Sequence, residues 1–179
     1  MKVCVFGGTF DPPHIGHLLI AQTVCEAENF DKVLFMPAYS PPHKNKFTAF
    51  NHRIEMVKIA IEDNLKFEYS DVDIMRKGIS YTIDSIRDIK NKYDLKNDEI
   101  YYLIGSDSLI DFKNWKDPEK ILNECRVIVA IRPGFRPSDI PLWILQKIHF
   151  ANVPRFELAS SKIRSRWVKD LTIRYMVTL

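Results

Sequence analysis

Two histidines near the start of the chain have a spacing suited to binding a phosphate group. His14 and His17 lie three residues apart with Gly16 between them, in the run Gly-Gly-Thr-Phe-Asp-Pro-Pro-His-Ile-Gly-His that begins at Gly7. If a helix begins near the two prolines, both imidazoles lie on the face of its first turn. Unpaired backbone N–H groups and the positive end of the helix dipole attract an anion to that point. The run therefore predicts a phosphate-binding turn.

This run differs from the commoner phosphate-binding loops. It contains no Gly-Lys-Ser/Thr, and no GxGxxG follows the short apolar strand Val3–Phe6. The histidine pair also fits two alternatives: a glycine turn with two packed surface histidines, or a metal site. Zinc takes three or four protein ligands, and no Cys or carboxylate at ligand spacing accompanies the pair, so the phosphate site is favoured.

A second candidate anion site lies near the C-terminus. The run Leu-Ala-Ser-Ser-Lys-Ile-Arg at residues 158–164 predicts the start of a helix, with Ser160 or Ser161 as its N-cap. Two hydroxyls, free backbone N–H groups and an arginine that can bind two phosphate oxygens would clamp a triphosphate. The alternative is an ordinary capped helix with an exposed Arg164. Its occurrence together with the histidine run favours the clamp.

Alternating strands and helices are expected to position these residues. Short β-rich apolar runs alternate with helical patterns along the chain, which is typical of repeated βαβ units. We predict an α/β fold with a Rossmann-like open parallel sheet, helices on both faces and right-handed connections. The predicted strands are Lys2–Phe6, Lys32–Met36, Lys66–Tyr69, Glu99–Ile104, Arg126–Ile131 and Ile148–Ala151. The predicted helices are Ile15–Asn29, Asn51–Asn64, Thr82–Tyr93, Leu109–Trp115, Pro118–Glu124 and one that starts near Ser160.

Apolar residues recur at helical spacing in the second predicted helix. Ile54 and Val57 belong to this stripe and are expected in the core. Arg53 and Glu55 are assigned to the other side of the helix. The loop before this helix carries His43 and Lys44 shortly after a strand end, where open α/β sheets bind their ligands, so it is predicted to contact a ligand.

Length and composition narrow the class of protein. The 179 residues suit one domain, 1–179, and 46% of them are apolar. The chain has no apolar stretch of membrane length and no signal-peptide pattern, so we expect a cytoplasmic protein without a membrane partner. Cys4, Cys25 and Cys125 are odd in number and lie in apolar segments, which predicts reduced core thiols. A net charge of +3 favours small phosphorylated ligands over nucleic acid.

Together these motifs resemble the HxGH nucleotidyltransferase superfamily, whose histidines hold the phosphates of a nucleoside triphosphate. Residues 158–164 are similar to the ISSTxIR motif of its adenylyltransferases, with Ala159 and Ser161 where the family usually shows Ser and Thr. Over nearly its whole length the chain resembles one branch, the bacterial nicotinate mononucleotide adenylyltransferases. The matching segments are the run from Gly7 to Leu18, Pro41-Pro42-His43-Lys44, Ser80-Tyr81-Thr82, Ile104-Gly105-Ser106-Asp107 and Trp115.

The resemblance implies an enzyme of NAD biosynthesis that transfers the adenylyl group of ATP to nicotinate mononucleotide and releases pyrophosphate. Mg²⁺ would enter with ATP, and no metal site on the protein is implied. The residues implied in catalysis are His17, His14, Lys44 and Arg164. Those implied in ATP binding are Gly7, Gly8, Thr9, Phe10, His14, Gly16, His17, Gly105, Asp107, Ser160, Ser161, Ile163 and Arg164. Those implied in nicotinate mononucleotide binding are Thr9, Phe10, Lys44, Tyr81, Thr82 and Trp115.

The resemblance also assigns individual roles that have structural alternatives. Backbone donors of Tyr81 and Thr82 would bind the carboxylate of the pyridine ring, and Trp115 would stack on that ring. Asp107 would bond the ribose or the adenine. Without a ligand, Trp115 is a packed aromatic residue, Tyr81 an ordinary residue before a helix, and Asp107 a helix cap.

Two other functions stay open, and the chain departs from the family in one place. One is a cytidylyl- or adenylyltransferase with another acceptor; in the phosphopantetheine branch Thr usually replaces the first histidine, so His14 counts against that acceptor. The other is a nucleotide sensor or nucleic-acid-binding module, supported by the basic C-terminal helix alone.

Family members usually continue into a last helix beyond the position of Leu179, so we expect a shortened tail, in a monomer or a homodimer. The sequence assigns no role to residues 133–141.

Overall fold

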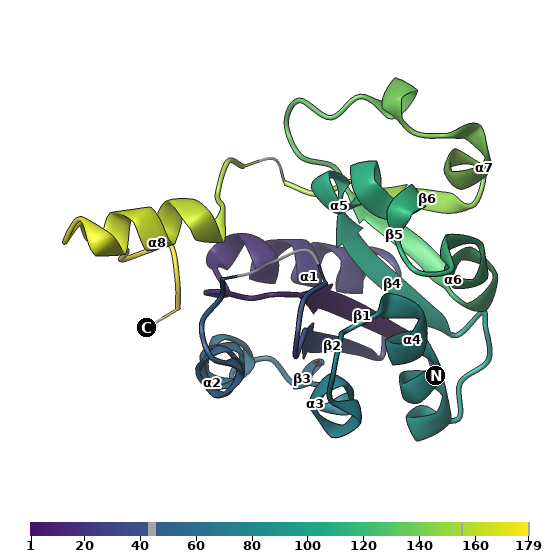
Figure 1. The fold of residues 1–179 in the computed structure, drawn as a ribbon, viewed down its shortest axis with the longest axis horizontal. Helices are drawn as coiled ribbons and strands as arrows, with labels where there is room; N and C mark the ends of the chain where they lie inside the picture. Colours follow the sequence, from purple (N-terminus) through teal and green to yellow (C-terminus); the bar gives the residue numbers. More distant parts are fainter. Residues whose placement is uncertain (43–45, 155, 179) are drawn as a thin grey trace.

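A six-stranded parallel sheet forms the centre of the described chain (Figure 1). The structure is a computed structural model that describes residues 1–42, 46–154 and 156–178. The strands are β1 Val3–Gly8, β2 Lys32–Pro37, β3 Phe67–Tyr69, β4 Ile100–Gly105, β5 Arg126–Ala130 and β6 Ile148–Ala151. Their order is β3-β2-β1-β4-β5-β6, and all neighbouring strands are parallel. The order reverses between β1 and β4, so their carboxyl ends form the switch point at which such sheets bind ligands.

Helices occupy the connections between strands and cover both faces of the sheet. They are α1 Ile15–Ala27, α2 Phe50–Ile61, α3 Val72–Arg76, α4 Thr82–Tyr93, α5 Ser106–Asp111, α6 Pro118–Glu124, α7 Leu142–Leu145 and α8 Ser160–Val168, with 3₁₀ turns η1 Phe112–Asn114 and η2 Pro137–Asp139. Helices α1 and α2 pack on one apolar core, and α4, α5 and α6 pack on the other. Helix α8 projects from the body beside the start of α1 (Figure 1).

The burial of β1 confirms the predicted α/β fold. Val3 and Val5 pack into the core on one face of the sheet, whereas Cys4 and Phe6 pack into the core on the other. A strand covered on both faces has no polar alternation, which is why the central strands read as continuous apolar runs. The three cysteines are free and buried, as predicted.

The sequence-based helix assignments were wrong at several boundaries. Helices α3 and α7 were not predicted, because five and four residues are too few to show a helical period. The helix predicted over Leu109–Trp115 begins earlier, at Ser106, and ends in the 3₁₀ turn η1, which leaves Trp115 after the helix. Helix α1 begins at Ile15, as predicted, but ends at Ala27, before the predicted end at Asn29.

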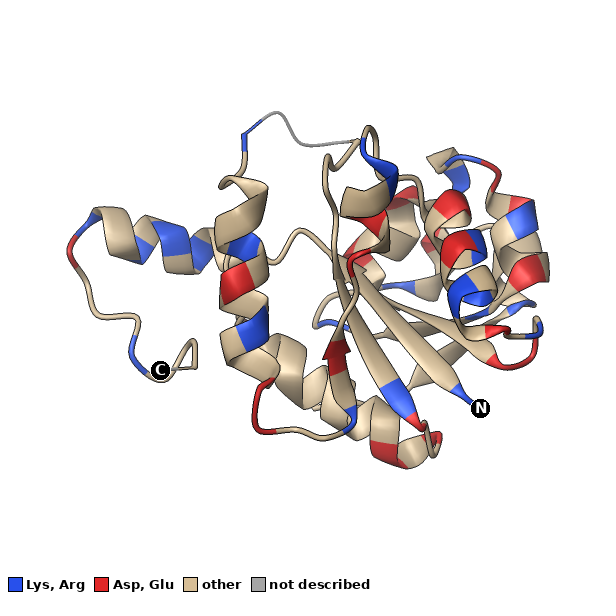
Figure 2. Cartoon of the chain, turned by 90° about the horizontal axis from the view of Figure 1, so that it is seen from below, with Lys and Arg blue, Asp and Glu red and all other residues tan. Residues whose placement is uncertain are grey.

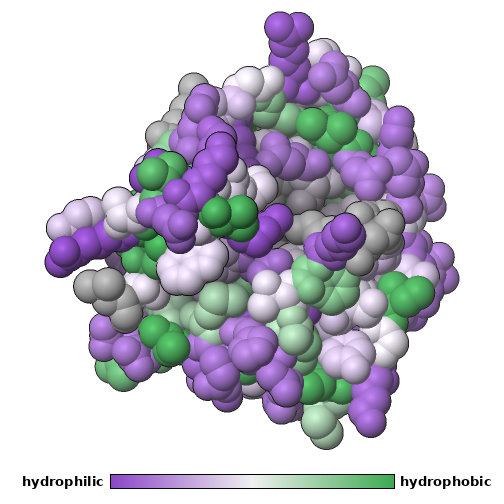
Figure 3. Space-filling model, turned by 60° about the vertical axis from the view of Figure 1, so that its left-hand side comes forward, coloured by the Kyte–Doolittle hydropathy of each residue, from purple (hydrophilic) through white to green (hydrophobic). Residues whose placement is uncertain are grey.

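The surface carries charges of both signs in most places. Figure 2 shows acidic and basic residues interspersed on the helices beside the sheet, whereas α8 is basic, with Lys162, Arg164 and Arg166. On the face that Figure 3 brings forward, apolar side chains lie in small separate groups among hydrophilic ones. Within the described residues, no helix is long and apolar enough to cross a membrane.

Candidate active site

The two histidines of the first motif bind each other's backbone at the start of α1. His14 is the N-cap of α1 and His17 is its third residue. The Nδ1 atom of His17 accepts a hydrogen bond of 3.1 Å from the His14 N–H, and the Nδ1 atom of His14 accepts one of 3.3 Å from the His17 N–H. Their rings stack with centroids 3.6 Å apart. The pair therefore lies together as predicted, through a reciprocal cap and not through a shared helical turn.

These backbone bonds determine which nitrogen of each ring can act on a ligand. Because each Nδ1 accepts a hydrogen bond, the neutral ring carries its proton on Nε2. His14 is only 2% exposed, and its Nε2 atom is buried without a partner among the described residues. Burial, and secondly the positive charge of Arg132, lower the pKa of His14 from 6.5 to about 4. At neutral pH, His14 is thus an uncharged Nε2–H donor.

Aromatic side chains of the core pack against the histidine pair and hold it in place. Phe10 is 2% exposed and lies edge-on to the His17 ring, with centroids 5.1 Å apart. The Phe10 side chain therefore belongs to the core, which leaves its backbone to meet a ligand. At Gly16, an added Cβ would lie 2.4 Å from Cε2 of Phe156 and 3.0 Å from Nδ1 of His14. Any larger residue there would displace the Phe156 ring and crowd the His14 ring.

The second motif packs directly against the loop that precedes α1. The Ser160 hydroxyl donates to the Pro12 carbonyl at 2.8 Å, and Nη1 of Arg164 donates to the Asp11 carbonyl at 2.6 Å. The predicted serine cap was wrong: Ala159 is the N-cap of α8, and Ser160 uses its hydroxyl for this contact instead. Ile163 anchors α8 in the body, and Ser161 is exposed. The structure thus brings the two anion motifs together.

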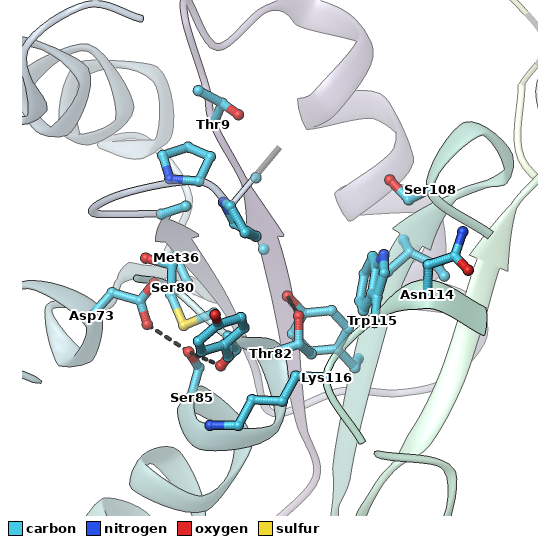
Figure 4. A pocket seen from close by; sticks show the side chains of 18 residues that line it. Thr9, Met36, Asp73, Ser80, Thr82, Ser85, Ser108, Asn114, Trp115 and Lys116 are labelled. Carbon is cyan, nitrogen blue, oxygen red and sulfur yellow. Dashed lines mark hydrogen bonds between the residues drawn. The ribbon is translucent and has the colours of Figure 1, made fainter. Parts of the chain in front are cut away.

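A pocket opens beside the histidine run at the carboxyl ends of β1, β2 and β4 (Figure 4). Its walls come from the β1 turn, the ends of β2 and β4, the start of α4 and the segment after η1. The lining residues include Gly7, Gly8, Thr9, Met36, Asp73, Ser80, Tyr81, Thr82, Ser85, Tyr102, Ser108, Asn114, Trp115 and Lys116. All the described residues predicted for pyridine nucleotide binding line this pocket, except Phe10.

The start of α4 offers this pocket backbone donors that have no acceptor among the described residues. Tyr81 is the N-cap of α4, and its side chain makes no capping bond. The first-turn N–H groups of Thr82 and Ile83 have no intrahelical acceptor, so a bound anion can cap them. Ser85 holds the turn by donating to Asp73 Oδ1 at 2.5 Å, as Figure 4 shows. Opposite this turn, Trp115 packs on Phe112 with ring centroids 5.1 Å apart.

A buried arginine that was predicted on the wrong side of its helix joins the site loops. Arg53 has no exposed surface. Its guanidinium donates to the carbonyls of Thr48 at 2.9 Å, Thr9 at 2.8 Å and Tyr39 at 3.3 Å. It therefore ties the loops after β1 and β2 to the start of α2. Arg53 lies three residues after Phe50 and four before Val57, both buried, and this spacing was the missed signal.

Gly105 and Asp107 lie at the carboxyl end of β4, as predicted, together with an arginine that was not predicted. Asp107 Oδ2 accepts a bond of 2.7 Å from Nη1 of Arg132, and the Arg132 N–H donates to Ser106 Oγ at 3.0 Å. Asp107 is in the first turn of α5 and does not cap it; Gly105 is the N-cap. Arg132 follows β5, so it brings a positive charge to the same edge as His14.

Two further predictions concern the loop before α2, which was expected to contact a ligand, and metal binding by the protein. Lys44 and His43 lie outside the described residues. Among the residues that the structure does describe, no group of three or more His, Cys, Asp or Glu side chains is arranged to hold a metal ion.

Comparison with characterised proteins identifies the relatives of this chain. Residues 5–166 match the model of the cytidylyltransferase-like family. The nicotinate-nucleotide adenylyltransferase of Bacillus subtilis (strain 168) is 39% identical over 178 residues, which are 98% of this chain and 90% of that protein. The probable nicotinate-nucleotide adenylyltransferase of Exiguobacterium sibiricum is 40% identical over 99% of this chain and 92% of its own.

Solved structures share the fold. Nicotinic acid mononucleotide adenylyltransferase of Plasmodium falciparum, complexed with NaAD, superposes with a TM-score of 0.78 at 23% identity, over 96% of this chain and 86% of the other. That likeness confirms the nucleotidyltransferase type of open sheet. With the sequence relatives, it leads to one conclusion: this chain belongs to the cytidylyltransferase-like family and, within it, to the nicotinate-nucleotide adenylyltransferases.

Proposed function

We propose that this protein transfers the adenylyl group of ATP to nicotinate mononucleotide, forming nicotinate adenine dinucleotide and pyrophosphate. One observation carries the proposal: the phosphate-binding turn of His14 and His17 adjoins a pocket lined by Tyr81, Thr82 and Trp115. The histidine turn suits phosphates, and the pocket suits a flat ring with an acidic substituent. Membership of the family and the bound NaAD of the Plasmodium falciparum relative support the same pairing of substrates.

The reaction needs alignment and charge neutralisation rather than a general base. A phosphate oxygen of nicotinate mononucleotide attacks the α-phosphorus of ATP, a new P–O bond forms, and the bond from the α-phosphorus to the bridging oxygen of pyrophosphate breaks. The attacking phosphate monoester is already largely ionised at pH 7, because its second pKa is about 6. The protein's task is therefore to hold the two phosphates in line and to stabilise the leaving charge.

We assign the phosphate contacts from the two motifs. The Nε2–H groups of His14 and His17 donate to the α- and β-phosphate oxygens, assisted by the backbone of the turn from Gly7 to Phe10. Ser160, Ser161 and Arg164 bind the leaving pyrophosphate, and Lys44, which lies outside the described residues, is assigned to the triphosphate. Arg164 already donates to the Asp11 carbonyl through Nη1, and a guanidinium has four further N–H groups for phosphate oxygens.

The remaining contacts concern the ribose, the metal and the pyridine ring. Gly105 and Asp107 lie at the end of β4, where Asp107 can accept from a ribose hydroxyl. Mg²⁺ enters as the complex of ATP, bound chiefly by the phosphates. The pyridine ring stacks on Trp115, and its carboxylate caps the N–H groups at the start of α4. Thr9 lines the pocket between the phosphate turn and the ring.

Pyrophosphate release tests this proposal directly. Purified protein with ATP and Mg²⁺ should release pyrophosphate rapidly with nicotinate mononucleotide, more slowly with its nicotinamide analogue and not with phosphopantetheine. Replacing ATP by CTP should abolish release. Turnover with another acceptor only would leave the phosphate assignments standing and refute the pyridine pocket. No turnover with any acceptor would refute the proposal.

A further inference from the structure

One lysine at the mouth of the pocket stands beside the place assigned to the pyridine substituent. We infer that Lys116 determines the preference for the acid over the amide form of the pyridine ring, and that Asp84 moderates this preference. The inference rests on the proposed function and names the residue that sets its substrate specificity. Among the described residues that line the pocket, Lys116 is the one with a positively charged side chain.

The contacts of Lys116 place its ammonium group at the first turn of α4. Its Nζ lies 2.9 Å from Asp84 Oδ2 and 4.6 Å from the centre of the Tyr81 ring. Tyr81 is the N-cap of α4, and Asp84 is in its first turn. In Figure 4 the Lys116 side chain runs from below Trp115 toward the side of the pocket on which Ser85 lies. The ammonium group therefore lies at the first turn of α4, whose N–H groups would bind the carboxylate.

The ion pair of Lys116 and Asp84 is suited to admit a third charge. The side chains keep 43% and 29% of their exposed surface, so the pair is held weakly. An ammonium group has three N–H donors, so Lys116 can bind a substrate carboxylate while one donor stays on Asp84. The other charged residue of the lining, Asp73, is 2% exposed, and Arg76 Nη2 binds its Oδ1 at 2.8 Å, which offsets its charge.

Charge is the property that separates the two pyridine nucleotides at this point. Their rings stack alike on Trp115, and an oxygen of either substituent can accept from the N–H groups of α4. At pH 7 the acid form carries a full negative charge there, whereas the carboxamide is neutral and directs N–H donors toward the ammonium group. Lys116 therefore stabilises the bound acid form selectively.

Three variants test the inference through kcat/KM for the acid and amide mononucleotides and through calorimetric binding of each. Lys116→Gln should lower the acid-to-amide ratio about tenfold or more, through a raised KM for the acid form, with little change in kcat or in the KM for ATP. Asp84→Asn should raise the ratio about threefold, because Lys116 loses its competing partner. Lys120→Gln is the matched control: Lys120 pairs with Asp117 at 3.2 Å outside the pocket lining, and the ratio should not change.

The outcomes separate this inference from the proposed function. If the wild type uses nicotinate mononucleotide but Lys116→Gln keeps its ratio, or loses both acceptors equally, the inference is overturned and the proposed function stands. A ratio that falls in Asp84→Asn, or falls equally in Lys120→Gln, also overturns it. If the wild type uses neither acceptor, the proposed function fails, and this inference fails with it.

Discussion

Lowering the pH from 7 to 5 should destabilise this protein through His14. The pKa of His14 is about 4 in the folded protein and 6.5 when the ring is in water. Between these values the unfolded chain binds more protons than the folded one, so the free energy of unfolding falls as the pH falls. The contribution is fully present above pH 6.5 and is lost as the pH falls toward 4.

The size of the effect follows from the two pKa values. A difference of roughly 2.5 units corresponds to about 3 kcal/mol in total, of which about 2 kcal/mol is lost between pH 7 and pH 5. Little of this is screened by solvent, since His14 is 2% exposed. The free energy of unfolding of a typical protein is about 5–15 kcal/mol, so the contribution of the His14 ring is a large fraction of it.

Urea unfolding of the wild type and a His14→Asn variant at pH 7, 6 and 5 measures this term. Asparagine is a good N-cap, and its carbonyl oxygen can accept the His17 N–H as Nδ1 does, but it does not titrate. All other titrating groups are common to both proteins. The wild type should lose about 2 kcal/mol more than the variant between pH 7 and 5. Equal losses would refute the assignment of a buried, neutral His14.

Three further predictions concern the proposed site. Replacing His17 by Ala should cost about 3 kcal/mol or more of transition-state stabilisation, measured as kcat/KM; near-normal turnover would remove it from the phosphate site. Trp115→Ala should raise the KM for nicotinate mononucleotide about tenfold or more and leave that for ATP nearly unchanged, whereas equal effects would indicate a folding defect. Arg53→Met should lower the free energy of unfolding by about 3 kcal/mol or more, because buried carbonyls lose their donors; a loss under about 1 kcal/mol in urea titration would contradict this.

The fold was largely predictable because its central strands are apolar on both faces. Strands such as β1 and β2 stood out as continuous apolar runs between helical patterns, and the structure confirms them. The missed elements α3 and α7 are short helices whose conformation depends on neighbouring contacts rather than on a period of their own. Boundaries shifted for the same reason: Ser106 begins α5 because the chain turns directly out of β4.

The site was predictable where the chemistry lies in a short segment and not where it depends on the tertiary structure. The pair His14 and His17 could be identified because glycines, strand and spacing coincide within one run. Arg53 could not be recognised as the joint of the loops after β1 and β2, since its acceptors are backbone carbonyls that carry no residue-specific signal. Likewise, Arg132 gains its place beside Asp107 only when β5 pairs with β4.

The contact between the two anion motifs explains why neither could be interpreted alone. Ser160 and Arg164 bind the carbonyls of Pro12 and Asp11, so the start of α8 is held by the loop that also leads into the histidine cap of α1. These bonds link side chains to backbone carbonyls that lie 148 and 153 residues away in the sequence, so they depend on the tertiary structure. A local capped helix and a local glycine turn would each be ordinary. Because the two motifs are attached, the fold fixes the distance between the histidines and Arg164. A fixed distance is what the alignment of a transferring and a leaving phosphate requires.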